Sequence, residues 1–134
     1  MSGVHVHLRV GAERYALPVA DVRSIVDMEG LAPVLGMPPS VLGMRVHDGA
    51  LLPVFDLARL LGVAGAEPAR IVVVESAGGL GLAVDEVLDV AELPELSEES
   101  TSERLRGSAL LDGVLVGAID LPVVLGSLEA ELAA

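Results

Sequence analysis

The chain of 134 residues has no cysteine and no tryptophan, and Tyr15 and Phe55 are its only tyrosine and phenylalanine. The lack of cysteine excludes a disulfide framework, a thiolate nucleophile and a cysteine-type zinc site. Apolar residues nevertheless make up 52% of the chain, so the interior is built from Val, Leu, Ile and Ala, a composition that favours strands. The length suits one domain with a modest core, or two small cores that share a boundary.

Basic residues are also scarce: 8 Lys and Arg stand against 20 Asp and Glu, which gives a formal net charge of −12. Binding to nucleic acid requires clustered Lys and Arg, so this class of function is disfavoured, as is binding to an anionic membrane surface. No apolar run approaches the length of a membrane span, and the N-terminus lacks a signal-peptide pattern. We therefore expect a cytoplasmic protein with no direct membrane insertion.

One sequence unit occurs twice. Residues 48–62 read DGALLPVFDLARLLG and residues 112–126 read DGVLVGAIDLPVVLG, with seven identities in fifteen positions. In each copy Asp-Gly predicts a tight hairpin turn, the apolar run predicts a buried strand, and the second Asp predicts a helix N-cap. Gly62 and Gly126 stand where a short helix commonly ends.

The duplication extends further towards the N-terminus, because residues 15–26 align with residues 80–91. Many short strands, frequent turns and only one-turn helices predict a mainly β fold of two linked five-stranded β-barrels. We expect a single domain over residues 1–134. Residues 17–82, including the hairpin and helix at 41–62, are expected to form the first barrel region, and residues 1–16 and 83–134 the second barrel and closing elements.

Local patterns give further expectations. Residues 4–10 alternate Val and Leu with His5, His7 and Arg9, which predicts a strand with one buried and one wet face. The apolar spacing within residues 20–26 predicts a short helix, and residues 85–88 are expected to form a short turn. The acidic, Ser-rich residues 94–103 are expected to form a solvated loop.

Candidate catalytic and metal sites are weak. His5, His7 and His47 could ligate a metal, but no matching carboxylate spacing accompanies them, so we expect surface histidines and no metal. Asp56 and Asp120 could act as a general acid and base, yet each precedes a helical stretch, which favours capping. No cofactor is expected, and an enzyme or ligand-binding barrel is the least favoured of the functions considered.

Four longer stretches carry a family resemblance. They are YALPVADVRSI at residues 15–25, GMRVHDGALLPVFDLARLLG at 43–62, IVVVESAGGLGLAVDEVLDV at 71–90 and LLDGVLVGAIDLPVVL at 110–125. Together they resemble the CheW-like domain, the adapter family that couples chemoreceptors to the histidine kinase CheA in bacterial chemosensory arrays.

The resemblance implies a fold of two SH3-like five-stranded barrels and a cytoplasmic location at chemosensory clusters. It implies three partners: the regulatory domain of a CheA-type kinase, the helical tip of a chemoreceptor and other CheW-like domains. By position, the groove that would hold the receptor tip includes Val22, Ile25, Val87 and Val90. From the sequence alone, each of these four residues could equally be part of the core.

Two departures from the family motifs concern partner choice. Ser24 replaces the Glu of V-x-E-I, and Val46, His47 and Asp48 stand where the family has N-L-R. Either a polar pair was lost together, or the surface meets a different partner. The favoured function is a non-enzymatic adapter between receptor and kinase, and the alternative is an accessory CheW-like protein that has lost one standard contact and tunes array assembly.

Overall fold

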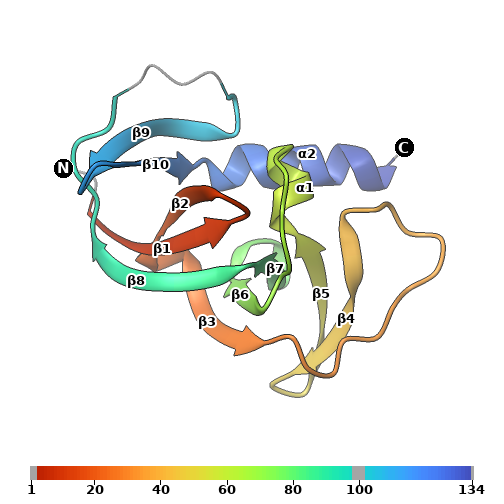
Figure 1. The fold of residues 1–134 in the computed structure, drawn as a ribbon. Coiled ribbons are helices and arrows are strands. Elements are labelled where there is room, and N and C mark those ends of the chain that lie inside the picture. The colour runs from red at the N-terminus through yellow and green to blue at the C-terminus, as the bar shows by residue number, and fades with distance from the viewer. Residues whose placement is uncertain (1–2, 98–101, 134) are drawn as a thin grey trace.

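The computed structural model describes residues 3–97 and 102–133, and these contain ten strands arranged as two five-stranded β-barrels (Figure 1). This confirms the predicted fold class. The first barrel has the strand order β3-β6-β7-β5-β4, and the second has the order β8-β1-β2-β10-β9. The strands of the first barrel are β3 (Val22–Asp27), β4 (Val41–His47), β5 (Ala50–Asp56), β6 (Arg70–Val74) and β7 (Leu80–Val84). Those of the second are β1 (Val4–Val10), β2 (Glu13–Pro18), β8 (Glu86–Glu92), β9 (Leu105–Leu111) and β10 (Val114–Ile119).

Each barrel combines strands from both halves of the duplicated sequence. The first repeat supplies β1 to β5 and the helix α1 (Leu57–Leu61), and the second supplies β6 to β10 and the helix α2 (Leu121–Ala133). In the first barrel the β6–β7 hairpin lies between β3 and β5, whereas in the second the β1–β2 hairpin lies between β8 and β10. The two repeats have therefore exchanged their N-terminal hairpins.

The repeated motif forms the predicted local structure at its turns and caps. Asp48 and Asp112 adopt left-handed φ angles of 49° and 50°, and the glycine after each has a φ of 78°, as the tight hairpin turn requires. Asp56 accepts a hydrogen bond from the backbone N–H of Ala58, and Asp120 accepts one from Val123, so both carboxylates cap helices.

Three apolar cores follow from the two-barrel architecture. One small core fills each barrel, and a larger core between the barrels also receives the inner faces of α1 and α2. Strand β6 is buried on both faces, because Ile71 and Val73 point into the first barrel while Val72 and Val74 point into the inter-barrel core. This double burial explains why its sequence is a continuous apolar run.

Strand β1 occupies the equivalent position in the second barrel, and here the prediction of a wet face is wrong. Val6, Leu8 and Val10 enter the inter-barrel core as expected, but His5 and His7 on the other face are buried as well. A His5 ring nitrogen lies 2.9 Å from the Gly3 carbonyl, and Nε2 of His7 lies 3.2 Å from the Ala91 carbonyl. These are buried, hydrogen-bonded histidines rather than surface ones.

Two further local predictions are wrong. Residues 20–26 form no α-helix: a 3₁₀ turn, η1 (Val19–Asp21), leads directly into the strand β3. The turn expected at residues 85–88 is reduced to Asp85, since β8 already begins at Glu86. Both segments form edge strands of their sheets, and a second 3₁₀ turn, η2 (Ser76–Gly78), joins β6 to β7.

The two helices of the repeat differ in length, which corrects the expectation of one-turn helices only. Gly62 ends α1 with a left-handed φ of 72°, as predicted. Gly126 does not end its helix, because α2 runs from Leu121 to Ala133 and places Leu128 in the inter-barrel core. Figure 1 shows α2 extending beside α1 towards the C-terminus.

The acidic segment is partly ordered against the second barrel. Residues 98–101 of the predicted loop lie outside the described residues. Before them, Leu96 packs against the core of the second barrel and Ser97 pairs with Ser108 of β9. The segment is therefore not purely a solvated loop.

The junction between the barrels is held by a buried carboxylate, Asp85. One of its oxygens accepts hydrogen bonds from the backbone N–H groups of Gly11 and Ala66, at 2.9 and 3.2 Å, and lies 3.5 Å from the guanidinium of Arg9. The β1–β2 turn and the linker between the repeats are thereby tied to the point where the chain passes from one barrel to the other.

Candidate protein-binding surfaces

The edge strands of the first barrel, β3 and β4, are joined by side chains. Oγ of Ser24 lies 3.3 Å from Nε2 of His47, and the guanidinium of Arg45 is 3.0 Å from a carboxylate oxygen of Asp27. Two positions that depart from the family motifs, Ser24 and His47, thus contact one another at this edge. The sequence did not reveal this contact, because the two residues lie 23 positions apart.

Ser24, His47 and Asp48 do not form a catalytic triad. The carboxylate of Asp48 lies 3.4 Å from Nε2 of His47, the same ring nitrogen that faces Ser24. In a triad the acid and the serine occupy opposite nitrogens of the imidazole, so that the ring can relay a proton between them. Asp48 is, moreover, exposed on the hairpin turn.

Asp27 is the titratable group most clearly affected at this edge. The side-chain hydrogen bond from Arg45 lowers the pKa of the Asp27 carboxyl, and a further hydrogen bond from the backbone N–H of Glu29 acts in the same direction. The carboxylate is therefore charged, and available to pair with Arg45, throughout the physiological pH range.

The four residues predicted to line the receptor groove differ in exposure. Val22 on β3 and Val87 on β8 are half-buried and pack against the inter-barrel core. Ile25 and Val90 lie on the same two strands but point outwards and are exposed. The outward-facing apolar surface at these strands therefore comes from Ile25 and Val90.

A second kind of exposed apolar surface lies on the two hairpins of the repeat. Val46 faces Leu51 across the β4–β5 hairpin, with exposed fractions of 66% and 69%. Leu110 faces Leu115 across the β9–β10 hairpin, with exposed fractions of 66% and 62%. We call these the first and second hairpin pairs.

The hairpin pairs occupy corresponding positions in the repeat, 64 residues apart. Because each pair places two large aliphatic side chains side by side in solvent, each pair is a candidate interaction surface. Sequence reasoning singled out only Val46. The missed signal is that two consecutive leucines, Leu51 and Leu52, cannot both point into the same barrel.

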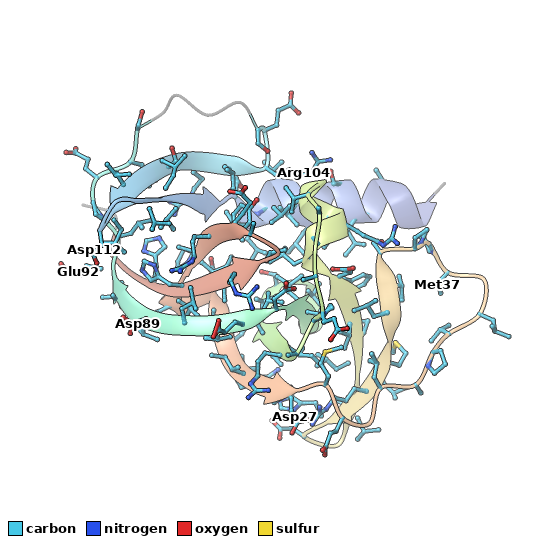
Figure 2. All side chains as sticks on the ribbon, in the orientation of Figure 1. Asp27, Met37, Asp89, Glu92, Arg104 and Asp112 are labelled. Atoms are coloured by element: carbon cyan, nitrogen blue, oxygen red, sulfur yellow. The ribbon has the colours of Figure 1, made fainter. Side chains whose placement is uncertain are left out.

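A third apolar segment is the long connection between β3 and β4. Val34, Leu35 and Met37 are exposed on it, and Figure 2 shows Met37 at the outer edge of the molecule, away from both barrels.

The histidines lie too far apart in the fold to form the three-ligand site considered above: His5 and His7 are in the second barrel and His47 is in the first. Within residues 3–97 and 102–133, no three His, Asp or Glu side chains are grouped so that they could hold a metal ion. The helices of the same residues include none long and apolar enough to cross a membrane.

Comparison with known proteins agrees with this architecture. The family model of the CheW-like domain matches residues 5–129. The probable chemotaxis protein CheW of Rhizobium etli is 30% identical, with 96% of this chain and 90% of that protein covered. The chemotaxis protein CheW of Rhizobium meliloti is 27% identical over the same shares of the two chains.

A solved structure is also similar. The crystal structure of the scaffolding protein TtCheW from Thermoanaerobacter tengcongensis superposes with a TM-score of 0.78 at 26% identity, covering 90% of this chain and 86% of that one. The family match spans nearly the whole chain, and both barrels are present. This chain belongs to the CheW-like domain family.

Proposed function

We propose that this protein is a non-enzymatic adapter that couples chemoreceptors to a CheA-type histidine kinase in a cytoplasmic chemosensory cluster. Membership of the CheW-like family supports the proposal, as do relatives named as chemotaxis and scaffolding proteins. The observation that carries it is the presence of one exposed hairpin pair on each barrel, at corresponding positions of the duplicated sequence.

The hairpin pairs are the proposed contacts to the kinase regulatory domain and to other CheW-like domains. Burying a leucine side chain against a partner contributes about 1.5–3 kcal/mol, so each pair suits a small, reversible interface. Two such surfaces on one chain allow it to bridge two neighbours, and an array of many weak contacts gains its strength from multivalency.

The receptor tip is proposed to bind along β3 and β8, with Ile25 and Val90 as exposed contacts. Val22 and Val87 support these strands from the inter-barrel side. A helical tip with apolar residues at helical spacing would place its apolar stripe on such a surface.

The test is a pull-down of the kinase regulatory domain and of a receptor-tip peptide, each tested separately. We expect Leu51→Glu and Leu115→Glu each to weaken kinase binding about tenfold or more while leaving receptor binding intact. Ile25→Glu should have the opposite pattern. Val123→Glu, which introduces the same charge on an exposed face of α2, is the control. If the wild-type protein binds neither partner, the proposed function is refuted.

The second candidate is an accessory adapter that binds only one of the two partners. Its support is the Ser24–His47 contact beside the exposed Asp48, where the family motifs have a Glu and an Arg. Asp48 cannot donate the two parallel hydrogen bonds that an arginine at this position would offer to a carboxylate of the partner. Wild-type binding to only one partner, together with gained binding in Asp48→Arg, would favour this candidate. Binding of both partners by the wild type would reject it.

A further inference from the structure

Arg104, in the turn immediately before β9, carries a guanidinium nitrogen, Nε, that has no hydrogen-bond partner among the described residues. This atom is fully buried. By contrast, Arg9, Arg45 and Arg59 each pair with a carboxylate. A buried, unpaired guanidinium donor is costly, and it is unexpected in a chain with 20 acidic residues.

A cavity of about 480 Å³ opens beside this residue. It lies between the second barrel and the end of α1, and its walls include Tyr15, Leu61, Val63 and Leu105 in addition to Arg104. Figure 2 shows Arg104 next to the end of α1, where the two barrels meet. The volume is in the range of sites that take small organic ligands.

Tyr15, which lines this cavity, carries a second polar group. Burial raises the pKa of its hydroxyl, and the charge of Glu13 acts in the same direction. The hydroxyl therefore remains a neutral hydrogen-bond donor throughout the physiological range. An arginine and a tyrosine hydroxyl in one cavity together suit an oxyanion.

A second cavity, of about 650 Å³, lies next to the first and shares the lining residues Tyr15 and Val63 with it. The second cavity is lined mostly by backbone and small apolar side chains of the β1–β2 turn and the linker, Ala12 and Ala64 among them. A ligand that fills both cavities therefore needs an anionic end and an apolar body.

We propose that these two adjacent cavities together bind a small organic monocarboxylate, with its carboxylate on Arg104 and Tyr15 and its aliphatic tail along Val63 and Ala64. A single negative charge is favoured over phosphate because Glu13 and Glu103 line the same cavities and the chain as a whole is acidic. This ligand site is independent of the adapter function, because it uses neither the hairpin pairs nor Ile25 and Val90.

The test is an NMR titration of the full chain with octanoate, 1-octanol and inorganic phosphate. We expect octanoate to bind with a Kd of about 1 mM or below, and to shift the amide signals of Gly62, Val63 and Leu105. 1-Octanol and phosphate should each bind about tenfold more weakly, since each lacks one half of the recognition. Equal binding of 1-octanol, or shifts that map elsewhere, would overturn the proposal.

A carboxylate is also present at the C-terminus of a peptide, so a short apolar peptide is titrated with a free and with an amidated end. Binding of the free peptide about tenfold tighter than octanoate would overturn the assignment to a small acid. Weaker binding of both peptides supports it.

The variant Arg104→Gln should lower octanoate affinity about tenfold or more, because it replaces a charged donor with a neutral one. Arg14→Gln makes the same charge change at an exposed position of β2, outside both cavities, and should leave the affinity unchanged. Circular dichroism establishes whether each variant is folded. If Arg104→Gln fails to fold, the wild-type chemical-shift map and the comparison with 1-octanol still decide the proposal.

Discussion

Asp85 is the residue at which the first barrel, the second barrel and the linker between the repeats meet. Its carboxylate is buried and is satisfied by two backbone N–H groups and by Arg9. Removing such an acceptor leaves the two N–H groups without a partner in a buried site, and this cost exceeds the net value of the hydrogen bonds themselves.

We expect Asp85→Ala to lower the free energy of unfolding by about 2–4 kcal/mol, with Asp85→Asn intermediate because it keeps one acceptor oxygen. Urea denaturation followed by circular dichroism measures the change. Glu92→Ala removes an exposed acid from β8 and should change stability by less than about 0.5 kcal/mol. Equal effects of the two alanine variants would show that Asp85 is not a structural anchor.

Asp27 predicts a pH dependence at the edge between β3 and β4. Its pKa is lowered from the ordinary value of 3.8 in the folded protein, so its contribution to stability is present above pH 3.8 and is lost as the pH falls through the lower folded-state value. Asp27→Asn should therefore show a smaller loss of stability on acidification below pH 3.8 than the wild type. Because the group is exposed, the difference should also shrink in high salt.

Acid titrations of stability at low and high salt test this prediction, with Glu92→Gln as the matched control. A titration curve of Asp27→Asn that coincides with that of the wild type would show that the Arg45 contact does not persist in solution.

At the residue scale, the sequence predicted the turn and cap chemistry but not the burial of His5 and His7. Asp48, Asp56 and their counterparts act locally, within a few residues of the chain, so pattern alone was sufficient. The histidines are buried because β1 lies between a barrel interior and the inter-barrel core. The side of the barrel that covers His7 is formed by the strand that includes Ala91, more than eighty positions away.

At the scale of elements, Gly62 and Gly126 occupy the same position in the repeat but different backbone conformations. Gly62 has a left-handed φ of 72°, whereas Gly126 lies within α2 and has no atom within 4 Å of the space that a Cβ would occupy. Alanine is strained in the first conformation and preferred to glycine in the second.

We therefore expect Gly126→Ala to raise the free energy of unfolding by about 0.5–1 kcal/mol and Gly62→Ala to lower it by about 1 kcal/mol. Each variant is the control for the other, because both make the same chemical change in the same repeated motif. Thermal and urea unfolding provide the measurement, and changes of the same sign would contradict the difference between the two helix ends.

Strand β3 shows why one element was assigned wrongly from the sequence. Val22, Ser24 and Val26 are partly buried, and Arg23, Ile25 and Asp27 are exposed, which is the alternation of a strand. The pattern was obscured because the inner face carries a polar residue, Ser24, and the outer face carries an apolar one, Ile25. The apolar residues of the segment, Val22, Ile25 and Val26, consequently have helical spacing.

The outward position of Ile25 on β3 is also relevant to the candidate binding surface. An apolar residue on an outer face weakens the strand signal, and it is also what an interaction surface requires. Ile25 was selected through the family resemblance, whereas Leu51, Leu110 and Leu115 were not selected at all. Their orientation depends on strand register, which the sequence did not define.

At the scale of the whole molecule, the exchanged hairpins make the two repeats dependent on one another. Residues 1–66 contain β1 to β5, and residues 67–134 contain β6 to β10, so each fragment lacks the central hairpin of its own barrel. We expect neither fragment to fold as a monomer, and an equimolar mixture to recover the β-sheet circular dichroism of the intact chain.

Analytical ultracentrifugation of each fragment and of the mixture tests this expectation, with the intact chain as the reference. A fragment that is monomeric and cooperatively folded would show that the central hairpin is dispensable and would contradict the mutual dependence.

The exchange also determines the order in which the protein can be completed during synthesis. The β1–β2 hairpin leaves the ribosome first, but its neighbours β8 and β10 are translated only after all strands of the first barrel, and β10 ends at Ile119. The first barrel needs only the chain up to Val84. Both edges of the earliest hairpin therefore stay unpaired through most of translation, which makes it the segment on which a nascent-chain chaperone would have the greatest effect.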